Sequence, residues 1–308
     1  MAVEYGGLKS NFKAQGWTPL GALRMGCIFF ASVPILILQA GMIKFSRKRW
    51  WPVAAFWHRT MCRILGLEIR VLGAIKHPGP ILYASNHVSW LDIIILGGLL
   101  ENASFIAKSE MAQWGFLGTM CGLHKTVFVN RTRRTDAKNQ ADRLTDRIKD
   151  GDSLILFPEG TSTDGGRVVP FKSSLFSVAE RADEASDHRL QIQPLTLAFT
   201  EMNGIPLVRS QRPLVAWLGD VELFDHLRQF LALARTVVTI EYHKPITFQE
   251  AGCRKTLATY CEQEVRGGLE RAARLEMRMG RRAERASSAT EEAGSEPDSG
   301  RLQAHLDT

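Results

Sequence analysis

The chain has 308 residues, of which 45% are hydrophobic and 23% charged, and this composition excludes wholesale disorder and a collagen-like repeat. Its five cysteines contain no Cys-x-x-Cys pair, which argues for a reducing compartment and against a zinc knuckle or a secreted disulfide framework. A formal net charge of +7 favours a polyanionic partner, which could be nucleic acid, anionic lipid or a phosphorylated substrate.

The segment Met25–Ile43 predicts contact with a membrane. It carries no charge, is flanked by Arg24 and by four basic residues within 44–49, and approaches the roughly 20 apolar residues that a bilayer-spanning helix needs. It begins too far into the chain for a cleaved signal peptide. Pro34 lies in its middle, so a half-inserted arrangement stays open beside a full span, and a buried core helix is the third alternative.

A short aromatic and basic stretch follows, in which Pro52 is well placed to begin a helix. Amphipathic tryptophan rings favour the headgroup level of a bilayer, so we expect an interfacial helix, with an ordinary core helix as the alternative. Residues 1–66 are therefore expected to anchor the chain, single-pass or monotopic, with the rest on the cytoplasmic face of a bacterial-type inner membrane. The aromatic residues of this stretch are Trp50, Trp51, Phe56 and Trp57.

From residue 67 onward, short β-branched runs alternate with helix-like stretches. This alternation predicts an α/β domain over residues 67–279, with a mixed, mostly parallel sheet flanked by helices. A polar helix is expected from Phe248 to about Met279, and the Ser-, Gly- and acid-rich residues 280–308 are expected to be disordered. The expected strands are EIRVLG, PILYASN, SFIAK, TVFVN, SLILFP, QIQPLTLAF, PLVAWLG and TVVTIEY, and the expected intervening helices are Trp90–Leu100, Arg133–Lys149, Lys172–Ala185 and Val221–Ala234.

The string NHVSWLD, Asn86–Asp92, directly follows the apolar strand ILYAS. A histidine and an aspartate at this spacing, where a strand ends and a helix begins, can fold back on one another. Asp92 then fixes the tautomer of His87, whose other ring nitrogen can take a proton from a hydroxyl. Such a dyad has no nucleophile of its own, so the alcohol of a substrate would attack directly. The spacing alone is not specific, and a structural histidine that caps a helix is the alternative.

Two further strand ends carry candidate ligand contacts. The strand in LILFPEGT runs into a turn with Glu159 and Gly160 at its tip, where glycine allows a ligand to approach the backbone. The following residues predict a loop in which Arg167 and Lys172 could contact an anion. Arg131 follows the strand TVFVN, and its planar guanidinium could hold a phosphate in a bidentate manner. An ordinary turn and a solvated surface arginine are the respective alternatives.

Together these strings resemble the glycerolipid acyltransferase family, which includes the 1-acylglycerol-3-phosphate acyltransferases. NHVSWLD matches its His-x4-Asp block, VFVNR its second block, FPEGT its third, and the IQPL within Gln191–Leu195 its fourth, in the order of the family. The resemblance implies transfer of an acyl group from acyl-CoA or acyl carrier protein to a lysolipid hydroxyl at a membrane, with no metal or further cofactor. It implies that His87 is the general base and Asp92 its partner. It also implies that Arg131 and the turn Glu159–Gly160–Thr161 position the acceptor, and the loop residue Lys172 is a further expected substrate contact.

The sequence departs from this family's pattern at one position. Many lysophosphatidate enzymes have an arginine after FPEGT, and here Ser162 takes its place. The preferred interpretation is acylation of 1-acylglycerol-3-phosphate to phosphatidic acid in phospholipid biosynthesis, with Arg131 and Lys172 supplying the missing charge. The alternative is acylation of lyso-ornithine lipid, whose enzymes belong to the same family.

Three other classes of protein receive less support. A membrane-bound scaffold on the same fold predicts a broken dyad, and the dyad here is intact. A nucleic-acid-binding protein needs basic residues interleaved with aromatics on a folded face, and the cluster within residues 47–63 adjoins the apolar segment instead. A serine hydrolase of the common α/β type needs a Gly-x-Ser-x-Gly elbow, which the sequence lacks.

Overall fold

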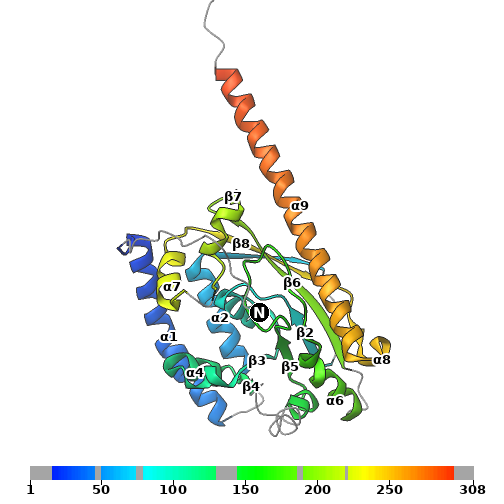
Figure 1. The fold of residues 1–308 in the computed structure, drawn as a ribbon. Coiled ribbons are helices and arrows are strands. Elements are labelled where there is room, and N and C mark those ends of the chain that lie inside the picture. Colours follow the sequence, from blue (N-terminus) through cyan, green and yellow to red (C-terminus); the bar gives the residue numbers. More distant parts are fainter. Residues whose placement is uncertain are drawn as a thin grey trace, which may run out of the picture.

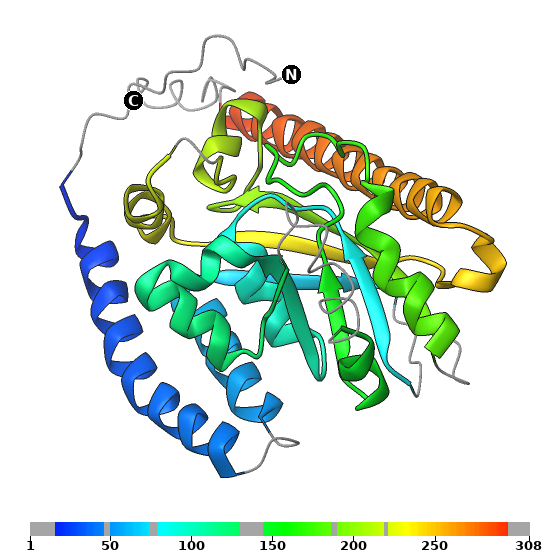
Figure 2. The same ribbon diagram turned by 60° about the horizontal axis from the view of Figure 1, so that its bottom comes forward.

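A computed structural model describes residues 16–45, 50–73, 79–129, 144–185, 190–218 and 221–294. Within these residues a nine-stranded sheet lies between two layers of helices (Figures 1 and 2). The helices and strands are α1 (Pro19–Phe45), α2 (Trp51–Leu65), β1 (Leu67–Leu72), β2 (Ile81–Ser85), α3 (Trp90–Leu99), β3 (Ala103–Lys108), η1 (Ser109–Gln113), α4 (Gly115–Leu123), β4 (Val127–Val129), β5 (Ser153–Leu156), η3 (Ser173–Phe176), α6 (Ser177–Ala185), β6 (Gln191–Met202), β7 (Ile205–Pro206), η4 (Arg209–Leu214), α7 (Leu223–Leu231), β8 (Thr236–Tyr242), β9 (Ile246–Thr247), α8 (Phe248–Ala251) and α9 (Arg254–Gly294).

The sheet is mixed and mostly parallel, as the sequence predicts. Its order is β1-β8-β6-β2-β5-β3-β4, with β7 and β9 also paired to β6. The strands from β6 through β4 run parallel to one another, whereas β8 is antiparallel to β6 and carries β1 parallel to itself. Pro194 is accommodated inside β6 because β6 exchanges one neighbour for another there: Ile192 pairs with β9 and Leu195 with β8.

Alternation along the central strands separates two hydrophobic cores. Tyr83 and Ile155 face the layer of α2, α3 and α7, which forms the first core. Leu82, Leu154 and Leu156 face the layer of α6 and α9, which forms the second. Because a strand exposes successive side chains to opposite faces, continuous apolar runs such as LILF build both cores at once.

The predicted elements between residues 67 and 279 are largely confirmed, with one wrong strand and one longer helix. PLVAWLG is not a strand, because Pro213 lies inside η4 and the N–H of Trp217 donates to the carbonyl of Val88 rather than to a strand. Helix α9 continues past residue 279 to Gly294, through a stretch rich in the good helix formers Ala, Glu and Arg. It extends beyond the sheet in Figure 1. Of the helix expected over 133–149, only residues 144–149 are described, and they are helical.

Helix α1 is inverted, with polar residues facing the protein and apolar residues facing outward. Arg24 donates to the carbonyls of Leu231, Leu233 and Ala234 at the end of α7. The other buried residues of α1 include Ser32 and Gln39. The outward-facing apolar side chains include Leu23, Phe29, Phe30, Ile37 and Leu38, and Phe30 is 77% exposed. By length and composition α1 is the one helix in the described part of the chain that could cross a membrane.

Helix α2 and Trp50, the residue before it, contribute most of their aromatic side chains to packing. Trp50 is fully buried, with its ring 5.3 Å from that of His124. The indole N–H of Trp51 donates to the carbonyl of Leu100, and that of Trp57 donates to the hydroxyl of Ser32. Only Phe56 of the four aromatics is exposed. The expectation that the tryptophans lie at the headgroup level is therefore wrong for Trp50, because α2 packs against α3 and α1 as a core helix.

Candidate active site

The His-x4-Asp and FPEGT strings meet at the carboxyl edge of the sheet. Strands β2 and β5 are parallel neighbours, with Ala84 paired to Leu156. Both chains therefore leave the sheet at the same edge, and the turn 86–89 lies beside the turn 157–160. This is the edge at which α/β sheets bind ligands.

His87 and Asp92 form the expected dyad. Nδ1 of His87 lies 2.7 Å from Oδ2 of Asp92, which favours the tautomer with the proton on Nδ1 and leaves Nε2 able to accept a proton. The imidazole stacks on the ring of Phe157, with 4.2 Å between ring centroids and 15° between planes. The side chain of His87 is 20% exposed, whereas that of Asp92 is fully buried. A solvent-accessible nitrogen oriented by a buried carboxylate is the arrangement that general-base catalysis requires.

Asp92 is fixed by the helix that it begins. Its Oδ2 also accepts the backbone N–H groups of Val88 and Ser89, at 2.6 and 2.9 Å. These donors surround the first turn of α3, whose dipole favours a negative charge. Among the described residues, Oδ1 of Asp92 and Oγ of Ser89 are buried and have no hydrogen-bond partner. The carboxylate is therefore held in one orientation through one of its two oxygens.

Glu159 lies behind the dyad rather than at its open side. It is 1% exposed, and its carboxylate accepts the N–H of His87 at 2.9 Å and the N–H of Val169 at 3.1 Å. Burial raises the pKa of Glu159 to about 8, although its two N–H donors act in the opposite direction. The sequence predicts that this residue contacts a substrate. The structure instead places it so that it ties the backbone of His87 to the loop that follows FPEGT.

The other expected contacts have different placements. Gly160 adopts a positive φ of 70°, which closes the turn beside the dyad. Thr161 is exposed next to it. Lys172 is exposed, and its backbone N–H donates to the carbonyl of Pro158. Arg131 lies outside the described residues. The structure thus brings His87, Asp92, Glu159, Gly160 and Thr161 together.

Three neighbours of the dyad were not singled out from the sequence. Asn86 is buried and bonds through both its amide atoms to the backbone of Leu197 on β6, which fixes the end of β2. Thr163 donates its N–H to the carbonyl of His87 at 2.9 Å. Phe157 stacks on the imidazole. Asn86 and Phe157 are the first residues of the two recognised strings, but the contacts that define their roles cannot be read from local sequence.

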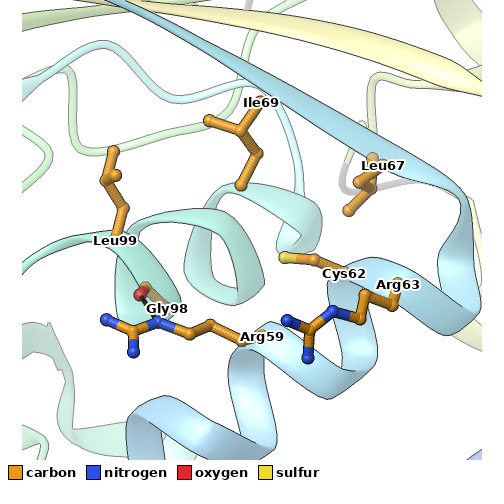
Figure 3. A pocket seen from close by; sticks show the side chains of 7 residues that line it. All are labelled: Arg59, Cys62, Arg63, Leu67, Ile69, Gly98 and Leu99. Atoms are coloured by element: carbon orange, nitrogen blue, oxygen red, sulfur yellow. Dashed lines mark hydrogen bonds between the residues drawn. The ribbon is translucent and has the colours of Figure 1, made fainter.

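A pocket of about 250 Å³ lies elsewhere, between α2, β1 and the C-terminal end of α3. Figure 3 shows Arg59 and Arg63 extending from α2 along this pocket, below Leu67, Ile69 and Leu99 in this view. Nε of Arg59 donates to the carbonyl of Gly98 and so caps the end of α3. The dyad lies at the opposite, N-terminal end of the same helix, so this pocket contains no expected site residue. Among the described residues, no group of three or more His, Cys, Asp or Glu side chains is arranged to hold a metal ion.

Comparison with known proteins identifies the family. A family model described as Acyltransferase matches residues 67–199. The lyso-ornithine lipid O-acyltransferase of Brucella abortus is 37% identical over 261 residues, which cover 82% of this chain and 96% of that protein. The chain belongs to the glycerolipid acyltransferase family. The 1-acyl-sn-glycerol-3-phosphate acyltransferase of Neisseria meningitidis is 30% identical over 66% of this chain and 74% of that protein.

A solved structure confirms the architecture of this family member. The 1-acyl-sn-glycerophosphate acyltransferase of Thermotoga maritima superimposes with a TM-score of 0.59, covering 82% of this chain and 95% of that one. The sequence identity is 18%, so this likeness shows the fold alone. The acyltransferase fold therefore includes the mixed sheet and the helices on both of its faces. The family resemblance that the four sequence blocks indicate is confirmed.

Proposed function

We propose that this acyltransferase acts on lyso-ornithine lipid and esterifies its free hydroxyl. This proposal is supported by relatives named lyso-ornithine lipid O-acyltransferase. The match covers 96% of the Brucella abortus protein at 37% identity and 74% of the Rhizobium meliloti protein at 34% identity. The relative from Neisseria meningitidis that is named for 1-acyl-sn-glycerol-3-phosphate matches at 30%. Lysophosphatidate, the acceptor that is the preferred interpretation of the sequence, becomes the second candidate.

The position after FPEGT supports the same acceptor. Where many lysophosphatidate enzymes carry arginine, Ser162 donates its hydroxyl to the carbonyl of Trp217 at 2.6 Å. A hydroxyl oriented in this way provides no positive charge to a phosphomonoester. An arginine that bonded to a phosphate would contribute about 1.5–3 kcal/mol as a charge-assisted hydrogen bond. The chain therefore lacks one contact that would favour lysophosphatidate.

The proposed chemistry follows from the geometry of the dyad. Nε2 of His87 takes the proton of the acceptor hydroxyl while the oxygen attacks the thioester carbon of acyl-CoA or acyl carrier protein. In the resulting tetrahedral intermediate the C–S bond breaks, the ester forms, and the proton passes from His87 to the departing thiolate, which leaves as a thiol. Asp92 stabilises the transient imidazolium. Arg131, Gly160, Thr161 and Lys172 are proposed substrate contacts, whereas Glu159 is proposed to act through the backbone of His87.

We further propose that α1 lies within one leaflet and does not cross the bilayer. Arg24, Ser32 and Gln39 bond to α7, α2 and the end of α4 respectively, so both ends of the helix stay against the domain. A crossing helix would leave the domain at one end. Burial of the outward apolar row in lipid would hold the catalytic edge at the membrane surface, where both the lipid acceptor and the soluble donor are within reach.

The test offers both acceptors to one enzyme. Detergent-solubilised full-length protein is incubated with lysophosphatidic acid and lyso-ornithine lipid together, with either acyl-CoA or acyl carrier protein as donor, and mass spectrometry follows both products. Acylated ornithine lipid that is absent with His87→Ala is the expected result. Formation of phosphatidic acid alone would show that lysophosphatidic acid is the acceptor, with the proposed mechanism unchanged. Formation of neither product with either donor would favour the scaffold alternative.

A further inference from the structure

We propose that Asp164 and Arg212 form the subsite that recognises the acceptor head group, and that this subsite fits a zwitterion with one carboxylate and one ammonium. The inference rests on the proposed function, because ornithine acylated on its α-nitrogen keeps these two charges. Asp164 belongs to the loop after FPEGT and Arg212 to η4, so the two residues come from distant parts of the chain.

The loop that carries Asp164 is folded onto the proposed base. Its neighbour Thr163 donates a backbone N–H to the carbonyl of His87 at 2.9 Å. On the other side of Asp164, Gly165 has a φ of +69°, and an added Cβ there would lie 3.2 Å from both methyl groups of Val88. Asp164 is therefore held between two residues that touch His87 and Val88. A head group bound at Asp164 would therefore lie beside the segment that carries His87.

Arg212 reaches the same place from η4. Its Nη1 lies 3.5 Å from the position of the same added Cβ at Gly165. The segment after η4 is fixed to the dyad loop at two points: the N–H of Trp217 donates to the carbonyl of Val88 at 3.0 Å, and Ser162 donates to the carbonyl of Trp217. Ser162 thus joins the two segments that carry the proposed subsite.

Both charges lack a partner of opposite sign within the described residues. Asp164 is half-buried, and its Oδ1 accepts only the N–H of Gly166, at 2.9 Å. Arg212 is also half-buried, and its guanidinium makes no hydrogen bond or ion pair with any described residue. The two do not pair with each other, although they flank the same glycine. Partly desolvated charges are normally compensated, so a ligand that carries both complementary charges would satisfy both residues.

The pair discriminates between the two candidate acceptors. A guanidinium binds a carboxylate in a bidentate manner, and an ammonium group can donate to the free Oδ2 of Asp164. A phosphomonoester carries between one and two negative charges at neutral pH and no positive charge. It would gain from Arg212 and be repelled by Asp164. The subsite therefore favours an amino-acid head group over a phosphate.

The test combines two variants with two altered acceptors. Asp164→Asn keeps an oxygen for the N–H of Gly166 and removes the charge, and Arg212→Gln removes the guanidinium. The acceptors are lyso-ornithine lipid, its norvaline analogue without the ammonium, and its carboxamide analogue without the carboxylate. On the natural acceptor, each variant is expected to raise KM at least tenfold and to change kcat less than threefold. The Asp164→Asn effect should disappear with the norvaline analogue, and the Arg212→Gln effect with the carboxamide.

Controls separate this inference from the proposed function and from misfolding. Asp150→Asn and Arg274→Gln, which change exposed charges elsewhere, should leave KM within twofold. Arg212→Lys keeps the positive charge but loses the planar guanidinium. Its KM for the acceptor should lie between the KM of wild type and that of Arg212→Gln. Suppose that wild type acylates lyso-ornithine lipid. If either variant then leaves KM unchanged, or if its effect persists on the analogue that lacks the matching group, the proposed subsite is wrong and the proposed function stands. If wild type does not turn over lyso-ornithine lipid, both fall.

Discussion

Glu159→Gln tests whether this buried carboxyl group positions the base or contacts a substrate. Wild-type Glu159 accepts two backbone N–H groups, from His87 and from Val169. A glutamine keeps the shape but can accept with only one atom, because its NH2 group would face an N–H. One buried donor is then left without an acceptor, at a cost of about 1–3 kcal/mol. If this cost is expressed in the positioning of His87, kcat should fall by about 5- to 150-fold, since each 1.4 kcal/mol is a factor of ten, with little change in acceptor KM.

The assay is steady-state kinetics of the purified full-length protein, with the exposed Glu222→Gln as a control of the same chemistry. A role in substrate contact predicts the opposite split, in which acceptor KM rises and kcat is kept. That outcome, or kinetics indistinguishable from wild type, would refute the positioning role. Circular dichroism and thermal unfolding of both variants establish that the fold is retained.

The same residue makes stability depend on pH. Burial raises the pKa of Glu159 from 4.5 to about 8, so the folded state keeps a proton that the unfolded state releases. The stabilisation due to the protonated form is fully present below pH 4.5 and is lost as the pH rises towards 8, by at most about 1.4 kcal/mol per pH unit. A glutamine cannot ionise and takes no part in this titration, so the stability of Glu159→Gln relative to wild type should improve as the pH rises from 5 to 8. A constant difference in Tm across this range would contradict the raised pKa.

Three further predictions concern other parts of the molecule. His87→Ala should lower kcat by about 10²–10⁴ with an unchanged Tm, as turnover and thermal unfolding would measure; a variant that keeps a tenth of the activity would remove His87 from the role of base. Asn86→Ala leaves the N–H and the carbonyl of Leu197 unsatisfied, and should lower the free energy of unfolding in urea by about 2–3 kcal/mol. The pair Phe30→Asp and Ile37→Asp should release the protein from vesicles in a flotation assay, whereas aspartates at the exposed Ile205 and Val208 should not.

The sheet was predictable because its information is local. The apolar composition of runs such as ILYAS and SLIL predicts that they are buried strands. The polar strings that follow them indicate the edge of the sheet at which a site forms. Parallel pairing of β2 with β5 then places the two strings side by side. PLVAWLG is equally apolar, yet it forms no strand, because its backbone bonds to Val88 instead of to a sheet edge. That choice depends on contacts more than a hundred residues away in sequence, which no local pattern contains.

The structure brings together five of the residues that the sequence assigns to the site, and their roles stay predictions. The sequence could suggest the dyad because His87 and Asp92 are only five residues apart, so their contact depends on local chain geometry. The direction of the Glu159 side chain depends on which backbone donors the loop 161–172 presents, and the loop acquires its shape from distant tethers such as that of Ser162 to Trp217. A motif in sequence gives no sign of whether a carboxyl group faces the solvent or the backbone behind it.

The fastening of α1 determines how the enzyme meets its lipid. Arg24 joins the membrane helix to the carbonyl end of α7, and Gln39 joins its other half to the end of α4. The helix is therefore fastened to the domain near both of its ends, without a flexible linker between these contacts. With α1 in one leaflet, as proposed above, the protein would set the height of His87 relative to the acyl chains. A lysolipid would then have to raise its hydroxyl to that level, so the distance between hydroxyl and head group would help to select the acceptor.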